Sequence, residues 1–281
     1  EEFIAHRLIP VLNSTPQVAA WRRLAQCHNR ALPAIIQLDS GMSRLGLSPE
    51  EVEAWIADPG FLDGIELRYL MSHLACAERR EHPMNAMQLQ KFKALRKRLP
   101  ACAASFANSS GIFLGDDFHF DLVRPGCALY GIAPMHGVEN PMQPVVRLQG
   151  KIIQTRTIAS GDHIGYGLTY RASRPSRIAT VAVGYADGWL RSFSNRAIAS
   201  IDGIQVPQVG NISMDTITLD VTDVDPAHLI PGAYADLLSA HHTVDAAAAL
   251  AGTIGYEILT SLGHRYQRNY TGGLQSPAHR I

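Results

Sequence analysis

Five short apolar runs alternate with amphipathic segments over the first half of the sequence, and this alternation constrains the fold more than any other feature. It is typical of parallel β–α units, because two parallel strands need a crossover connection, usually a helix. The expected strands are residues 8–12, 34–38, 69–74, 103–107 and 122–130. Two architectures fit: an open doubly wound sheet, or part of a (β/α)8 barrel. No GxGxxG follows the first run, which disfavours a dinucleotide-binding sheet.

The intervening segments carry helix signals. We expect helices at residues 17–26, 52–57 and 84–98. A hydroxyl side chain followed by proline precedes the first two, at Thr15-Pro16 and Ser48-Pro49, and proline is favoured at the first helical position. The third helix becomes basic towards its end, where positive charge suits the helix dipole.

The pattern of apolar and polar residues changes after residue 133. Shorter runs with alternating polarity predict strands, and Asp202-Gly203 between isoleucines predicts a hairpin turn. A helix at 244–251 has Thr243 as its expected N-cap. We therefore predict an α/β domain at 1–133 and a C-terminal β-rich domain at 134–281. The strands expected in the second domain are residues 145–157, 177–183, 197–201 and 216–221.

Composition excludes several classes of protein. The 25 Lys and Arg residues balance 25 Asp and Glu residues, which argues against nucleic acid or an acidic membrane surface as the main partner. No apolar run approaches the ~20 residues that span a bilayer, and no signal peptide is recognisable. The four cysteines show no CxxC spacing, which favours thiols of a reduced compartment and a cytoplasmic protein.

Polar residues follow the expected strands where ligands bind in parallel α/β domains, at the strand carboxyl ends. Arg44 follows the second strand and His73 ends the third. Ser109 and a glycine follow the fourth, and Arg124 with Gly126 follows soon after. Hydroxyl groups, free backbone N–H groups and an always-charged guanidinium resemble a pocket for a small phosphorylated molecule.

The second half contributes four turns rich in glycine and tyrosine, which suggest a lined site. No metal centre is expected: His73 with Glu78 provides too few ligands, and the acidic cluster at 116–121 and His241-His242 are interpreted as solvated loops. The four turns are centred on Tyr166, Tyr185, Met214 and Tyr256.

Taken in order, the motifs resemble those of alanine racemase, a pyridoxal-phosphate enzyme with a (β/α)8 barrel followed by a β domain. The matching segments are QLDSGMSRLG, MSHLA, FANSSGI, LVRPGCALYGI, GYGLTY, VAVGYADG, VGNISMD and TIGYEIL. They run from Gln37 to Leu259 with order and spacing preserved. The resemblance implies interconversion of L-alanine and D-alanine for peptidoglycan synthesis, with pyridoxal 5′-phosphate as cofactor.

The resemblance assigns a cofactor role to several residues. Arg124 would face the pyridine nitrogen, and Arg44 would contact the phenolic oxygen of the cofactor and the substrate carboxylate. An arginine cannot give up its proton, so it would leave the ring nitrogen largely unprotonated and limit side reactions. The phosphate would be held mostly by backbone N–H and hydroxyl donors, from Ser109, Gly126, Cys127 and Tyr256.

The resemblance also assigns the substrate chemistry. Tyr166 would be one of two catalytic acid/bases, with His73 and Arg124 in a hydrogen-bonded chain that helps its proton transfer. Met214 would offer its backbone N–H to the substrate carboxylate. Tyr185 and Arg191 would line the access path. In this family Tyr166 and Met214 act on the neighbouring subunit's cofactor, so a homodimer with composite active sites is implied.

The sequence departs from the family at the other base, a Schiff-base lysine on the first barrel strand within a motif like KADAYGHG. No such motif occurs here, and the lysines are Lys91, Lys93, Lys97 and Lys151. The first three are expected on the solvated face of a helix. The match begins near the family's fourth strand, so we expect an incomplete barrel of about five β–α units, an N-terminally truncated racemase, and no activity from this chain alone.

Two smaller departures concern Gln37, where many members carry a carbamylated lysine that braces Arg44, and Asn211, where an arginine is common. Both could change affinity or substrate breadth. The alternatives are a racemase of broader specificity that accepts serine, and a non-catalytic relative that binds pyridoxal phosphate. The retained proton-transfer residues disfavour the second alternative, whereas the missing lysine favours it.

Overall fold

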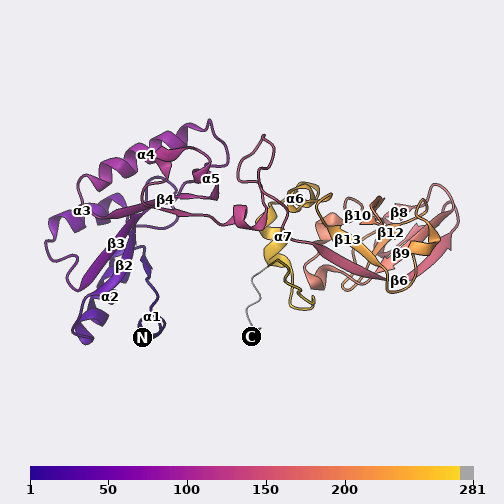
Figure 1. The fold of residues 1–281 in the computed structure, drawn as a ribbon, viewed down its shortest axis with the longest axis horizontal. Helices are drawn as coiled ribbons and strands as arrows, with labels where there is room; N and C mark the ends of the chain where they lie inside the picture. Colours follow the sequence, from indigo (N-terminus) through magenta and orange to yellow (C-terminus); the bar gives the residue numbers. More distant parts are fainter. Residues whose placement is uncertain (273–281) are drawn as a thin grey trace. The chain divides into compact units, whose positions relative to one another are not determined.

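The computed structural model describes residues 1–272. Two compact units are present, each shown in Figure 1. The first unit comprises Glu1–Leu129 and Ala133–Met142, and the second comprises Tyr130–Ile132 and the chain from Gln143 onward. Within residues 1–272, no helix combines the length and the apolar character needed to cross a bilayer.

The first unit is built on a five-stranded parallel sheet with the strands in sequence order. Strand order 1-2-3-4-5 excludes the doubly wound alternative over these strands, because such a sheet reverses direction at a switch point. Figure 1 shows helices α2, α3 and α4 on one face, as in the outer ring of a barrel. The strands are β1 (Val11–Leu12), β2 (Leu32–Gln37), β3 (Ile65–Met71), β4 (Ala103–Asn108) and β5 (Leu122–Arg124), and the helices are α1 (Glu2–Ala5), α2 (Thr15–Cys27), α3 (Pro49–Ala57), α4 (Pro83–Arg96) and α5 (Ser109–Ile112).

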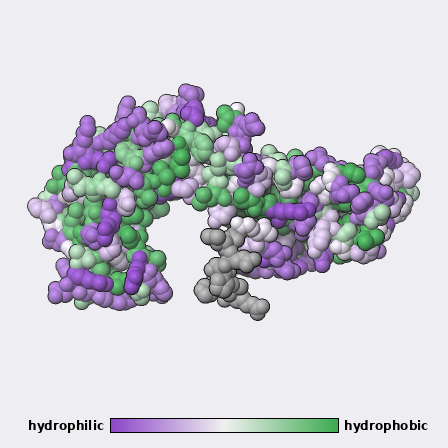
Figure 2. Space-filling model, viewed as in Figure 1, coloured by the Kyte–Doolittle hydropathy of each residue, from purple (hydrophilic) through white to green (hydrophobic). Residues whose placement is uncertain are grey.

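The core of this unit lies between the sheet and its helices. Phe92 of α4 stacks on Phe106 of β4 with ring centroids 5.0 Å apart, and Phe120 packs edge-on against both. Phe92 and Phe106 have no exposed surface. Figure 2 shows hydrophobic residues gathered over the strands of this unit and hydrophilic residues along α4. Burial of these rings fixes α4 against β4, which ends at the residues expected to bind a ligand.

Several local predictions were wrong in extent: the first expected strand, residues 8–12, is a strand only at Val11–Leu12. The run 122–130 is a strand for only three residues, because Pro125 removes a donor and the chain turns into a short 3₁₀ helix at Cys127–Tyr130. Helix α2 begins at Thr15, one position before the proline, and Ser14 is its N-cap. The Ser48 cap of α3 is as expected, with a capping box to Glu51.

The second unit is β-rich. Its main sheet has six strands in the order β11-β10-β13-β6-β9-β12, and a two-stranded ribbon pairs β7 with β8. The strands are β6 (Leu148–Ile158), β7 (His163–Ile164), β8 (Tyr170–Arg171), β9 (Ser176–Val181), β10 (Ile198–Ile201), β11 (Ile204–Pro207), β12 (Ile217–Asp220) and β13 (Tyr234–Leu238), followed by α6 (Val244–Ala251) and α7 (Gly255–Ser261).

The turn chemistry of this unit follows the sequence. Asp202 and Gly203 both have positive φ, at 49° and 77°, which is the type I′ geometry that joins β10 to β11. Thr243 caps α6 by accepting a hydrogen bond from Ala246 N. Strand β13 was not expected, although it connects β10 to β6 in the sheet.

Candidate active site

Arg124, at the end of β5, is the centre of the polar cluster in the first unit. Its Nη1 donates to Ser105 Oγ at 2.6 Å, and its Nη2 donates to the backbone oxygen of Ser72 at 2.8 Å. Nη2 also lies 3.3 Å from His73 Nδ1 and from the backbone oxygen of Phe106. Burial lowers the pKa of Arg124, but an arginine stays protonated in proteins. Strands β3, β4 and β5 therefore hold one cation at their carboxyl ends.

His73 is held neutral at this cluster. Burial lowers its pKa to about 4, and the positive charges of Arg124 and Arg44 add to the effect. Because an arginine only donates, His73 Nδ1 is the acceptor and the ring proton is on Nε2. The backbone oxygen of His73 accepts from Gln88 Nε2 at 2.9 Å, so α4 fixes the end of β3.

We expect the ring of His73 to show no protonation step near its ordinary pKa of 6.5. Its folded-state pKa is below the unfolded value, so the stability it contributes is present above pH 6.5 and declines as the pH falls towards 4. NMR of the imidazole carbons, assigned with His73→Gln, measures the midpoint. In Arg124→Met the midpoint should rise, because a positive neighbour is gone. A midpoint near 6.5 in the unsubstituted chain would contradict this assignment.

The expected phosphate cradle is assembled around the hydroxyl of Ser109. Ser109 Oγ accepts from Gly126 N at 2.6 Å and lies 3.3 Å from Ala128 N. The sequence suggested free backbone N–H groups here, whereas those at 126 and 128 both point at one oxygen. Cys127 is buried between them. An acceptor that reached Ser109 would meet two backbone donors and one hydroxyl.

Arg44 lies on an exposed loop after β2 that is folded by local contacts. Asp39 Oδ1 accepts backbone N–H groups from residues 41, 42 and 43, at 2.8, 3.0 and 3.1 Å. Buried Gln37 donates from Nε2 to the backbone oxygen of Leu45 at 3.1 Å. Gln37 thus braces the residue after Arg44 through its backbone, so a neutral amide can hold this loop without a charge. From the sequence, Asp39 was interpreted either as a site residue or as the partner of Arg44 in a strand-end turn; in the structure it holds the turn through three backbone N–H groups.

The second unit presents Tyr166 on a tight turn. Tyr166 is 74% exposed, and the flanking Gly165 and Gly167 have φ of 70° and 72°, which glycine adopts without strain. Asn211 Nδ2 donates to the backbone oxygen of Tyr166 at 2.8 Å. The amide of Asn211 therefore fixes the turn that carries the phenol.

Tyr166 and Tyr185 line one hollow of about 390 Å³, together with Arg191, Ile212 and Ser213. Met214 follows Ser213 directly and is exposed. The structure therefore brings together Tyr166, Tyr185 and the segment before Met214 within this unit. The motif around Tyr256 is the first turn of helix α7 and not a loop, so one of the four predicted polar-aromatic turns was wrong.

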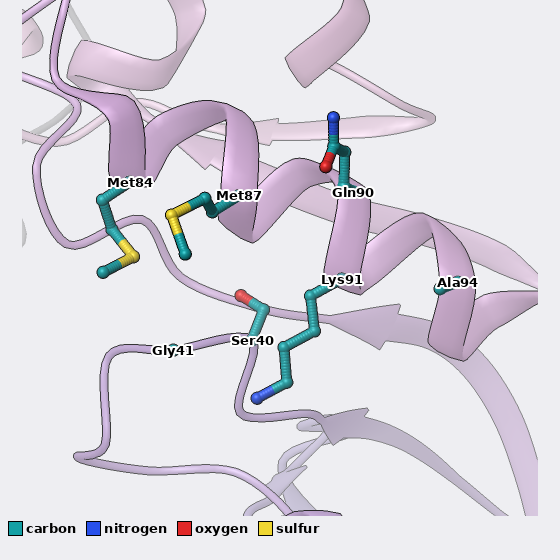
Figure 3. A pocket seen from close by; sticks show the side chains of 7 residues that line it. All are labelled: Ser40, Gly41, Met84, Met87, Gln90, Lys91 and Ala94. Carbon is teal, nitrogen blue, oxygen red and sulfur yellow. The ribbon is translucent and has the colours of Figure 1, made fainter.

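A second hollow, of about 540 Å³, lies between α4 and the loop after β2. Figure 3 shows Met84 and Met87 pointing from α4 towards Ser40 and Gly41, with Lys91 extended towards the same loop. None of its lining residues is a predicted site residue. Among the residues that the structure describes, no group of three His, Cys, Asp or Glu side chains could hold a metal.

The sequence did not predict the residues that hold the site residues in place by hydrogen bonds. Ser105 lies on β4 and Ser72 directly follows β3, and their oxygens accept hydrogen bonds from Arg124. Gln88 is buried in α4, donates to the oxygen of His73 and accepts from Ala75 N at 2.9 Å. A polar residue on the inward face of an amphipathic helix was the available signal, because a buried amide needs partners.

Comparison with known proteins gives a consistent family. A model described as alanine racemase, N-terminal domain, matches residues 1–134, and one described as alanine racemase, C-terminal domain, matches residues 145–270. A protein of Mesorhizobium japonicum named alanine racemase, catabolic, is 52% identical over 97% of this chain and 71% of its own length. An alanine racemase of Rhodospirillum rubrum is 50% identical over 97% of this chain and 73% of its own length.

Solved structures agree with the sequence matches. The alanine racemase of Bartonella henselae, described with covalently bound pyridoxal phosphate, superposes with a TM-score of 0.90 at 44% identity, over 96% of this chain and 75% of that one. The biosynthetic alanine racemase of Pseudomonas aeruginosa gives a TM-score of 0.85 at 34% identity, over 93% and 73%.

Proposed function

Because the chain belongs to the alanine racemase family, we propose that its residues form the greater part of an enzyme that interconverts L-alanine and D-alanine with pyridoxal 5′-phosphate. The observation that carries the proposal is the half-buried Arg124, held by Ser105 and Ser72 beside the Ser109 hydroxyl cradle. An incomplete (β/α)8 barrel and a C-terminal β domain form the scaffold.

The donor set fits the cofactor. Backbone donors at Gly126 and Ala128, the Ser109 hydroxyl and the buried Cys127 turn suit a phosphate, to which Tyr256 would add its phenol. A permanently protonated Arg124 suits a pyridine nitrogen that is to remain an acceptor. When bound, pyridoxal phosphate supplies an electron-withdrawing ring that acidifies the α-hydrogen of an attached amino acid.

This chain's own residues would bind the substrate and move its proton. Arg44 and the backbone N–H of Met214 would hold the carboxylate, and Tyr185 would limit access. The phenol oxygen of Tyr166 would add or remove the proton on one face of Cα. His73 is neutral and accepts a hydrogen bond from Arg124. It would thereby fix the positions of the protons in the hydrogen-bonded chain that assists Tyr166. The opposite face requires a second base, which in the family is the cofactor-bound lysine.

We further propose a homodimer in which Tyr166 and Met214 of one copy complete the site of the other, since Tyr166 projects into solvent within its own unit. We also propose a cytoplasmic role in supplying D-alanine to peptidoglycan, which the family chemistry and the four cysteines without CxxC spacing support. A domain boundary at residue 133 stays a prediction. Broader specificity towards serine is the remaining alternative substrate class.

The test is racemisation by a fusion protein in which a segment carrying the family's lysine motif, taken from a relative, precedes residue 1. We call this protein the lysine-complete fusion. With pyridoxal phosphate bound, it should convert L-alanine to D-alanine, followed by circular dichroism, and act much more weakly on L-serine. Cofactor binding without turnover of either amino acid would reject the proposal and favour a binding protein.

A further inference from the structure

Two turns of the second unit carry the residues proposed to meet the substrate, and they are locked to each other. The first, Gly184–Gly188, carries Tyr185, and the second, Ser213–Asp215, carries Met214. Tyr185 N donates to the oxygen of Ser213 at 3.1 Å, and Ala186 N donates to that of Met214 at 2.9 Å. A Cβ added at Gly184 would overlap the backbone oxygen of Met214, so only glycine permits this approach.

The end of α7 packs against the first of these turns. Gly263 N donates to the backbone oxygen of Asp187 at 2.9 Å. Gly188 has a φ of 90°, and a Cβ there would overlap the backbone oxygen of Ser261. The chain after α7 therefore contacts the turn that carries Tyr185 at backbone distance, which leaves no room for the turn to shift independently.

Arg265 bridges both turns through their carboxylates. Its Nε lies 3.2 Å from Asp187 Oδ1, and its Nη1 lies 2.8 Å from Asp215 Oδ1. Asp187 is only 9% exposed in its side chain, and its other oxygen accepts from Gly184 N at 2.8 Å. Burial raises the pKa of Tyr266, next along the chain, so that it stays a neutral phenol beside this carboxylate.

We infer that Arg265 is a positioning residue for substrate binding: its guanidinium holds the Tyr185 turn and the Met214 turn in one fixed arrangement. The inference rests on the proposed function. An exposed ion pair contributes little by itself, and Arg265 is 54% exposed in its side chain. Its effect comes from the planar fork, which satisfies two carboxylates on two different turns at once, as a lysine ammonium does not.

The inference predicts a defect in substrate affinity rather than in chemistry. In the lysine-complete fusion, Arg265→Gln should raise the KM for L-alanine about tenfold with kcat changed less than about twofold, because uniform binding is lost when the backbone N–H of Met214 is no longer held. Arg265→Lys should recover part of the loss, to about a threefold rise in KM. Arg174→Gln is the matched control, since Arg174 pairs with Asp223 at 2.6 Å in the same unit, and its KM should be unchanged.

A second measurement uses the 281-residue chain itself and needs no activity. Hydrogen exchange in Arg265→Gln should accelerate at the amides of Tyr185 and Ala186, whereas amides of β9 and β6 should exchange at the unsubstituted rate. Equal acceleration throughout the unit would mean a merely structural role and overturn the inference, as would unchanged exchange at both turns. If the unsubstituted fusion is inactive, the proposed function fails and the exchange experiment alone decides the inference.

Discussion

The 281-residue chain, given pyridoxal phosphate, should racemise alanine no faster than the free cofactor does. Of its four lysines, Lys91 and Lys93 lie on α4, Lys97 is the C-cap of that helix, and Lys151 lies on β6 of the second unit. None follows a barrel strand, where the proposed mechanism requires a cofactor-binding lysine as the second base. Without it, one face of Cα has no proton donor, and the cofactor is held by noncovalent contacts alone.

Circular dichroism of L-alanine solutions measures this turnover, with free pyridoxal phosphate as the background. The lysine-complete fusion is the positive control, because it differs only by the added segment. Turnover by the unextended chain well above the background would refute the assignment and require that one of the four lysines reach the cofactor. Lys91→Arg would then be the first substitution to test, because Lys91 lies near the loop of Arg44.

Replacement of Tyr166 by phenylalanine should lower racemisation by the lysine-complete fusion about 10²- to 10⁴-fold, the usual contribution of a positioned acid/base. The phenol oxygen is the only atom removed, and the turn is held by glycines and by Asn211 through the backbone, so its shape should survive. The loss should fall mainly on kcat, because the substrate carboxylate contacts are elsewhere.

Tyr170→Phe is the matched control for this substitution. Tyr170 lies four positions along, in β8, and packs against the small cluster of Ile164, Ile178 and Val209. Its activity should stay within about twofold of the parent, and absorbance of bound cofactor should be alike in the two variants. Equal activity of Tyr166→Phe and the parent enzyme would remove Tyr166 from the mechanism.

The sequence predicted the strand ends well because they have strong local causes. Short apolar runs form β2, β4 and the last part of β3, and the polar residues after them are placed by the parallel topology itself. Asp202-Gly203 and Thr243 were also predictable, because positive φ and helix capping each require a few residue types. The positions of His73, Ser109 and Arg124 at one edge follow from this reasoning.

Contacts between distant segments were not predictable from local pattern. Strand β13 has a weak pattern, and it exists because β10 and β6 pair on either side of it. Asp187 and Arg265 are 78 residues apart in the sequence, and no local pattern predicts that they pair. Gln88 shows the same limit, since its partner is the backbone of another element. Tertiary packing decides such contacts. The periodicity of a sequence shows which face of an element is buried, but it does not show which distant residue packs against that face.

The Ser109 hydroxyl occupies two backbone donors that the oxygen of a phosphate would use. By engaging the amides of Gly126 and Ala128, this side chain keeps the turn folded when no anion is bound. Arrival of a phosphate would then exchange one oxygen acceptor for another and would not require a loop to order. A turn that is folded by its own side chain offers proteases no loose segment at this place, because cleavage concentrates in poorly ordered chain.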